Sequence, residues 1–261
     1  MELNFKGKVA IVTGSSDGIG FAIARNLSRL GVKVLLVSRN IKKLKNARER
    51  IVKEKGIAEY IKADVSITST PKKVLKKCID MWGEVDILIN NTGGPDTGGI
   101  LKLTDKQWNY AIQNNLLSVI RFSRLVLPIM KKNNWGRIIT IGSTIVKEPS
   151  PNMILSATSR GGIQSFTKAI AIEFAKNNIS ANVISPGAIL TDRFRNLVKI
   201  AAKNENKSYE KKINEIKKII PANRIASADE ISSAVIFLSS ESGSYINGIN
   251  LSFDGAFTKG Y

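Results

Sequence analysis

Residues 9–20 read VAIVTGSSDGIG and combine four small apolar side chains, a glycine-rich segment and the start of a helical pattern. The short, mostly β-branched residues 9–12 predict a buried parallel strand. From Ile19 onward, apolar residues recur at helical spacing as far as Gly31. The stretch therefore predicts a strand, a tight turn and a helix in immediate succession.

The three glycines of this stretch have separate uses. Gly14 permits the tight turn, Gly18 lets the backbone approach a ligand, and Gly20 lets the helix pack against the strand. The helix N-terminus then offers free N–H groups and a positive dipole end to the phosphates of a dinucleotide. Glycine clusters also occur in ordinary turns, and the spacing G-x-x-x-G-x-G differs from the commoner G-x-G-x-x-G. The strand–turn–helix context favours the dinucleotide cradle.

Composition narrows the class of protein. The chain has 261 residues, 43% of them hydrophobic, which suits one α/β domain with a large core. No apolar run approaches the length of a membrane span, and the first strand begins within ten residues of Met1, so we expect a cytoplasmic protein. Histidine is absent and Cys78 is the one cysteine, which excludes Ser-His-Asp and Cys-His catalysis and leads us to expect no metal site.

The net charge of +19 allows two readings. Basic chains bind nucleic-acid phosphates, but the two densest runs of lysine and arginine, at 42–55 and 72–77, contain no aromatic residues on which bases would stack. A solvated, lysine-rich surface that attracts anionic cofactors or substrates is the better interpretation. We therefore expect no nucleic-acid partner.

Strand and helix patterns alternate along the chain. Strands are expected at 9–12, 32–37, 58–62, 85–89, 137–141, 179–184 and 249–253. Helices are expected at 19–30, 41–55, 70–83, 104–132, 156–176 and 227–240. Such alternation predicts a Rossmann-type, doubly wound parallel sheet in a three-layer α/β/α single domain over 1–261.

The alternation breaks at 191–220, a segment rich in lysine and asparagine with helical character. We expect a mobile helical lid over a substrate site. The alternative is a surface helical hairpin that only shields the core.

Several ordered motifs make the chain resemble the short-chain dehydrogenase/reductase family over nearly its whole length. They are the glycine segment 13–20, the Asn-Asn-Thr-Gly turn at 90–93, Asn115, and the Pro-Gly-Ala-Ile-Leu-Thr turn at 186–191. The resemblance is to 3-oxoacyl carrier-protein reductases and to sugar or alcohol dehydrogenases alike. It implies a nicotinamide cofactor, a small-molecule substrate and a homotetramer. Apolar residues on more than one face of helices 104–132 and 156–176 agree with such an assembly.

The resemblance also implies which residues contact the cofactor. They are Thr13, Gly14, Ser16, Asp17, Gly18, Ile19, Gly20, Arg39, Asp64, Val65, Asn91, Gly93, Arg160, Pro186, Gly187, Ile189 and Thr191. A carboxylate at the end of the second strand favours NAD, whereas arginine accommodates the 2′-phosphate of NADP. This strand ends in Ser38-Arg39, so we expect NADP(H) to be favoured over NAD(H), although Asp17 stands where many NADP-binding relatives have a basic residue.

The catalytic motif departs from the family pattern. The family uses a serine followed by Tyr-x-x-x-Lys on the next helix. Ser143 matches the serine, but the tyrosine and lysine positions hold Ser156 and Arg160, and no tyrosine occurs between Tyr110 and Tyr209. With Asn115, these residues make the candidate catalytic set.

The replacement changes the expected proton chemistry. The hydroxyl of serine is a far weaker acid than a phenol, and arginine practically never releases its proton. Ser143, Ser156 and Arg160 would polarise a carbonyl while water supplies the proton. Alternatively, Ser156 only caps the helix and Arg160 only binds cofactor. We expect an oxidoreductase interconverting a hydroxyl and a carbonyl by hydride transfer, the alternative being a catalytically silent dinucleotide-binding sensor or scaffold.

Overall fold

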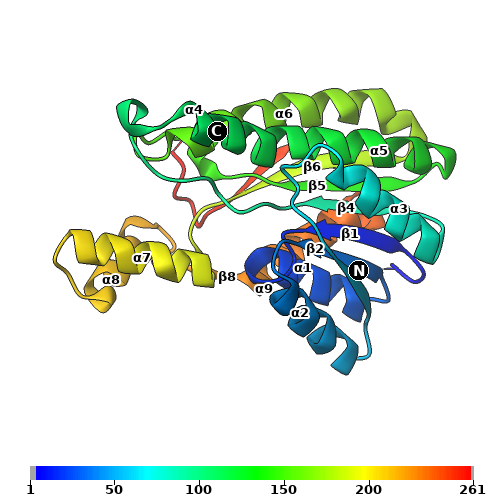
Figure 1. The fold of residues 1–261 in the computed structure, drawn as a ribbon, viewed down its shortest axis with the longest axis horizontal. Coiled ribbons are helices and arrows are strands. Elements are labelled where there is room, and N and C mark those ends of the chain that lie inside the picture. The colour runs from blue at the N-terminus through cyan, green and yellow to red at the C-terminus, as the bar shows by residue number, and fades with distance from the viewer. Residues whose placement is uncertain (1–3, 260–261) are drawn as a thin grey trace.

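A seven-stranded parallel sheet lies between two layers of helices in the computed structural model, which describes residues 4–259 (Figure 1). Its strand order is β3-β2-β1-β4-β5-β6-β9. The strands are β1 (Val9–Thr13), β2 (Lys33–Ser38), β3 (Ile57–Lys62), β4 (Ile87–Asn90), β5 (Gly136–Ile141), β6 (Ile179–Pro186) and β9 (Asn250–Phe253). The order reverses between β1 and β4, and the predicted doubly wound, three-layer fold is confirmed.

Helices cover both faces of the sheet (Figure 1). One layer contains α1 (Gly18–Arg29), α2 (Ile41–Lys53) and α9 (Ala228–Ser239), and the other contains α3 (Thr70–Trp82), α4 (Asp105–Ile112), α5 (Ser118–Lys132) and α6 (Ile154–Phe174). Val9 and Ile11 of β1 pack toward the second layer, whereas Ala10 and Val12 pack toward the first. The strand reads as a continuous apolar run because both its faces are buried.

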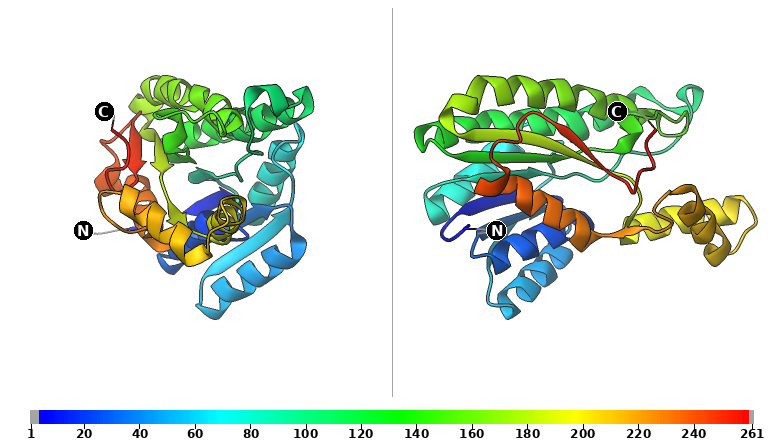
Figure 2. Two further views of the ribbon diagram at one scale, coloured as in Figure 1. Left: turned by 90° about the vertical axis from the view of Figure 1, so that its left-hand side faces the viewer. Right: turned by 180° about the vertical axis from the view of Figure 1, so that it is seen from behind.

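Two further helices, α7 (Asp192–Asn204) and α8 (Tyr209–Ile219), extend away from the body of the molecule (Figure 2). They occupy the segment 191–220 in which helices were expected. The sequence patterns did not predict the short parallel pair β7 (Ile189–Leu190) and β8 (Ala226–Ser227), which brings the two ends of the excursion together. That α7 and α8 act as a lid stays a prediction.

The helix expected over 104–132 is present as a continuous helical run from Asp105 to Lys132 with Thr104 as its N-cap, but it is not a uniform α-helix. A π-helical turn over Gln113–Leu117 separates α4 from α5. It turns Asn114 and Asn115 inward, where both are buried. The widened turn is stabilised by side-chain partners that lie far away in the chain, so the local apolar spacing does not indicate it.

Asn115 is the centre of this buried polar contact. Its Oδ1 accepts hydrogen bonds from Thr92 Oγ1 (2.9 Å) and Asn114 Nδ2 (3.0 Å), and its Nδ2 donates to Ser159 Oγ (3.0 Å). The amide thus joins the loop after β4 to the π turn and to α6, which fixes α6 relative to the edge of the sheet.

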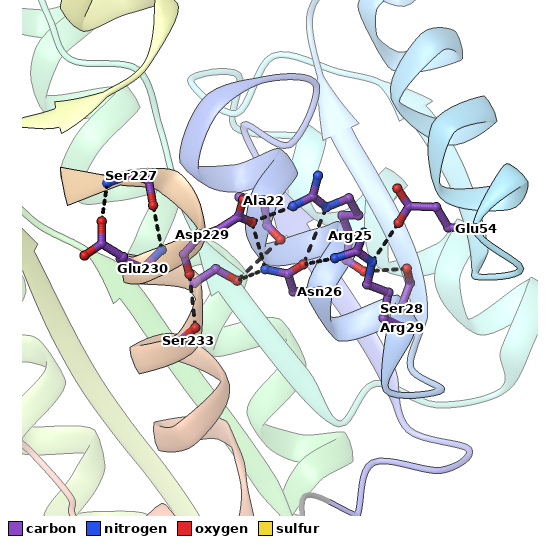
Figure 3. Close-up of polar contacts among 11 residues, drawn as sticks. Ala22, Arg25, Asn26, Ser28, Arg29, Glu54, Ser227, Asp229, Glu230 and Ser233 are labelled. Carbon is purple, nitrogen blue, oxygen red and sulfur yellow. Dashed lines mark hydrogen bonds and ion pairs between the residues drawn. The ribbon is translucent and has the colours of Figure 1, made fainter.

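Polar contacts join α1 to α9 and cap α9 (Figure 3). Arg25 and Asn26 both donate to Asp229 Oδ1, at 2.6 and 3.0 Å. At the start of α9, the Glu230 N–H donates to Ser227 Oγ, and the Ser227 N–H donates to the Glu230 carboxylate. This reciprocal capping box satisfies two backbone donors that a helix start otherwise leaves unpaired.

We predict that Ser227→Ala lowers the free energy of unfolding by about 1 kcal/mol, because the cap of α9 is lost. Urea denaturation at neutral pH measures the change. Ser233→Ala is the matched control, since the exposed Ser233 hydroxyl only bonds the Asp229 carbonyl one turn back. Equal losses in the two variants would contradict the capping role.

We predict a larger loss for Asn115→Ala, about 1–3 kcal/mol, because buried donors and acceptors are left without partners. Asn109→Ala makes the same chemical change at an exposed position of α4 and should have little effect. The same denaturation experiment compares the two. An Asn115→Ala variant as stable as Asn109→Ala would show that the buried network contributes nothing.

Candidate active site

Two adjoining cavities, each of about 190 Å³, open at the carboxyl edge of the sheet. The first, here the cradle cavity, is lined by Gly14, Asp17, Gly18, Ile19, Asn91, Thr92, Gly93, Thr191, Asp192 and Arg193. The second, here the serine–arginine cavity, contains Ser143, Ser156, Arg160 and Arg193 in its lining. Ligands of open α/β sheets bind at this edge, where the strand order reverses.

The cradle is built on close backbone contacts that only glycine allows. A Cβ atom on Gly14 would lie 2.5 Å from the carbonyl oxygen of Asn91, and one on Gly20 would lie 2.4 Å from the carbonyl oxygen of Gly14. Gly14 and Gly18 also have φ angles of +58° and +56°, which favour glycine. The roles inferred for Gly14 and Gly20 agree with this geometry, and the role of Gly18 beside a ligand stays a prediction.

Hydrogen bonds of Thr13 and Asn91 hold the glycine turn of the cradle in place. Thr13 is buried, and its hydroxyl donates to the Asn91 carbonyl and accepts from the Asn91 N–H, both at 2.9 Å. The Asn91 side chain donates to the Gly14 carbonyl at 3.1 Å. Both residues, predicted as cofactor contacts, are bonded to the protein itself, so their side chains position the glycine turn.

Asp17 begins α1 and is paired with Lys43 of α2. Its carboxylate accepts from the Gly18 N–H and from Lys43 Nζ, each at 2.7 Å. Partial burial alone would raise the pKa of Asp17, but these two hydrogen bonds outweigh it and lower the pKa below its ordinary value. The Lys43 pKa is raised by the same contact. Asp17 therefore brings a cation to the mouth of the cradle.

Polar and basic side chains gather where β2 ends. Ser16 and Ser38 share a hydrogen bond between their hydroxyl oxygens at 2.9 Å. The exposed Arg39 donates to the Tyr110 hydroxyl at 2.8 Å and lies 3.8 Å from the Asp64 carboxylate. With Lys43, this group presents two cations beside the cradle.

The predicted residues Asp64 and Val65 follow β3. Asp64 Oδ1 accepts from the N–H and the hydroxyl of Ser66, at 2.9 and 2.7 Å, which orders the loop. Val65 is partly buried against the core layer that contains α3 and α5. Because Asp64 lies 3.8 Å from Arg39, this loop is next to the basic group at the end of β2.

Ser156 and Arg160 meet inside α6. Arg160 Nη1 donates to Ser156 Oγ at 2.7 Å, and both side chains are buried, with Arg160 only 6% exposed. Loss of solvent and the nearby Arg193 charge lower the pKa of Arg160 to about 10. Ser156 does not cap the helix as one reading proposed, because α6 starts at Ile154 with Met153 as its N-cap residue. The helix instead presents Ser156 and Arg160 to the cavity together.

One further wall of the serine–arginine cavity comes from the predicted turn at 186–191, and another comes from residues 94–97 of the loop after β4. Pro186, Gly187, Ile189 and Thr191 all line the cavity, and Ser143 faces them from the segment after β5. Ser143 Oγ accepts from the Ile145 N–H at 3.3 Å, which leaves its own proton free to donate.

Three of the four candidate catalytic residues, Ser143, Ser156 and Arg160, thus line one cavity. Asn115 is not among its lining residues; its side chain donates to Ser159 of α6, and its catalytic role stays a prediction. Two residues were missed: Lys43 lies within a basic run without a distinguishing signal, and Arg193 reaches the cavities only through the direction of α7. Among residues 4–259, no group of three metal-binding side chains occurs, and no helix is long and apolar enough to cross a bilayer.

Known proteins resemble the chain over nearly its full length. Residues 8–201 match the family model described as short chain dehydrogenase. The 3-oxoacyl-acyl-carrier-protein reductase of Salmonella typhimurium is 37% identical, with 97% of this chain and 98% of the relative covered. An NADPH-dependent reductase of Bacillus subtilis is 32% identical over the same shares of the two chains.

A solved structure has the same architecture. The crystal structure of L-sorbose reductase from Gluconobacter frateurii, complexed with NADPH and L-sorbose, superposes with a TM-score of 0.95 at 28% identity and full coverage of both chains. The matching sequences, the sheet order and the glycine cradle all agree. The chain therefore belongs to the short-chain dehydrogenase family.

Proposed function

We propose that the protein is an NADP(H)-dependent oxidoreductase that interconverts a hydroxyl and a carbonyl group by hydride transfer. The observation that carries this function is that the glycine cradle adjoins the cavity in which Ser143, Ser156 and Arg160 meet. The known reductases to which the chain is similar support the same reaction class.

The residues present fit a dinucleotide. The cradle has no room for a Cβ atom at Gly14 or Gly20, and the first turn of α1 leaves backbone N–H groups for phosphate oxygens. Arg39 and Lys43 would hold the 2′-phosphate of NADP, which supports NADP(H) over NAD(H). Ile189 and Thr191 would contact the nicotinamide end, as the resemblance implies. When bound, the nicotinamide supplies or accepts the hydride.

The protein's own groups would polarise the substrate oxygen. Arg160 donates to Ser156 Oγ, so the Ser156 hydroxyl accepts this bond and keeps its own proton for another acceptor. Both residues line the cavity, where a substrate oxygen would be that acceptor. Ser143 offers a second hydroxyl. Neither serine is a strong enough acid to replace a phenol, so water delivers the proton, and the two hydroxyls with Arg160 stabilise the developing negative charge.

A catalytically silent dinucleotide-binding sensor or scaffold is the second candidate. It is favoured by one observation, the lack of a phenol acid anywhere between Tyr110 and Tyr209. Both candidates bind cofactor, and only the oxidoreductase turns over a carbonyl in a substrate panel with NADPH. The homotetramer and the cytoplasmic location also stay predictions; Ile172 of α6, 70% exposed in this single chain, agrees with a covered face in an assembly.

We predict tighter binding of NADPH than of NADH, measured by calorimetric titration. Arg39→Ala should weaken NADPH binding by about 10- to 100-fold, the loss typical of one charge-assisted hydrogen bond, and leave NADH binding nearly unchanged. Arg29→Ala removes an arginine at the far end of α1 and serves as the control. Tighter binding of NADH by the native protein would contradict the assignment.

We predict that the double variant Ser156→Tyr with Arg160→Lys reduces carbonyls faster than the native protein. A positioned general acid typically contributes about 10²- to 10⁴-fold, so steady-state NADPH oxidation with a generic ketone detects the gain. The control pairs Ser156→Ala with Arg160→Lys and supplies the same lysine without a phenol. Adding Ser143→Ala to the double variant should remove the gain. A double variant that binds NADPH and reduces nothing would favour the silent binding protein.

A further inference from the structure

Two guanidinium groups converge on the serine–arginine cavity. Arg160 enters from α6 and is only 6% exposed, and Arg193 enters from the first turn of α7. They are close enough that the charge of Arg193 lowers the pKa of Arg160. Like charges that meet in a confined space repel each other and carry a desolvation cost.

Within residues 4–259, no carboxylate lies within ion-pair distance of either guanidinium. Arg160 uses Nη1 on Ser156, and Arg193 donates only to the Pro95 carbonyl, at 3.3 Å. Asp96 also lines this cavity and favours the charged form of Arg193, but it is exposed and its carboxylate accepts from Gln107 at 3.0 Å. Arg193 is exposed, so solvent satisfies its remaining N–H groups, whereas Arg160 is buried and no hydrogen bond among the described residues uses its remaining N–H groups.

The two arginines differ in their relation to the phosphate cradle. Arg193 lines both cavities, whereas Arg160 lines only the one that contains Ser143 and Ser156. An anion that satisfies both arginines must therefore lie beside the two serines, away from Gly14 and Gly18. That is the place of the substrate rather than of the cofactor phosphates.

We propose that Arg160 and Arg193 form a subsite for a carboxylate on the substrate, so that the protein acts on small oxo or hydroxy acids. This substrate class rests on the proposed oxidoreductase function. The planar forks of the two guanidinium groups suit a carboxylate, which offers two acceptor oxygens. Because the arginines belong to α6 and α7, a bound carboxylate would also tie α7 to the body of the protein.

The test is calorimetric titration of the intact protein saturated with NADP⁺. The probe is 2-oxobutanoate, and its methyl ester is the neutral match. We expect the acid to bind at least about tenfold more tightly than the ester. Arg193→Gln should weaken binding of the acid by about 10- to 100-fold. Arg195→Gln removes the same charge from the same helix outside the cavity and should bind the acid normally.

Two results would overturn the subsite. Equal binding of acid and ester would show that the arginines do not recognise the carboxylate. Loss of NADP⁺ affinity in Arg193→Gln, with acid binding retained, would assign Arg193 to the cofactor phosphates. Failure of the proposed function gives a different result. If the protein binds the acid but turns over no substrate, the subsite stands and the proposed reaction is wrong. If it reduces neutral ketones but does not bind the acid, only the subsite is wrong.

Discussion

The crossing of α1 over the end of β1 is the constraint on which the rest of the site depends. Gly20 approaches the Gly14 carbonyl and the Asn91 amide so closely that even one added carbon has no room. This contact fixes the distance between α1 and the sheet. Asn91, which follows β4, donates to the Gly14 carbonyl and so links the turn to the end of that strand. The cradle and the neighbouring cavity are therefore parts of one rigid framework, which is the condition for holding two reactants in a fixed relation.

The sequence was sufficient for most of the fold because burial imposed simple patterns. β1 is buried on both faces and reads as an unbroken apolar run, while α9 begins with a Ser227–Glu230 capping box that its sequence displays. The predictions that succeeded concern segments whose partners are nearby in the chain or are simply apolar. Ser143, Ser156 and Arg160 came instead from the resemblance to the family motif; the structure places them on one cavity, and their catalytic role stays a prediction.

What the sequence did not predict depends on partners far away in the chain. The π turn at 113–117 forms where Asn115 meets Thr92 and Ser159, and no local periodicity reports such a contact. Arg193 looks like any basic residue of an exposed helix until α7 directs it over the cavity. Polar networks and charges that act at a distance are set by the tertiary structure, and a reading based on spacing cannot supply them.

The β7–β8 pair fastens both ends of the α7–α8 excursion side by side on the body of the protein. Because its ends are already joined, lengthening or shortening the excursion changes the closure entropy only slowly, by about 0.6 kcal/mol for each doubling of its length. The sheet is therefore insulated from changes in the length of this segment, although the N-cap and first turn of α7 supply Thr191 and Arg193 to the cradle cavity. Evolution can exchange the outer part of α7 and α8, together with the side chains they carry, while the sheet and the glycine turn stay folded as they are.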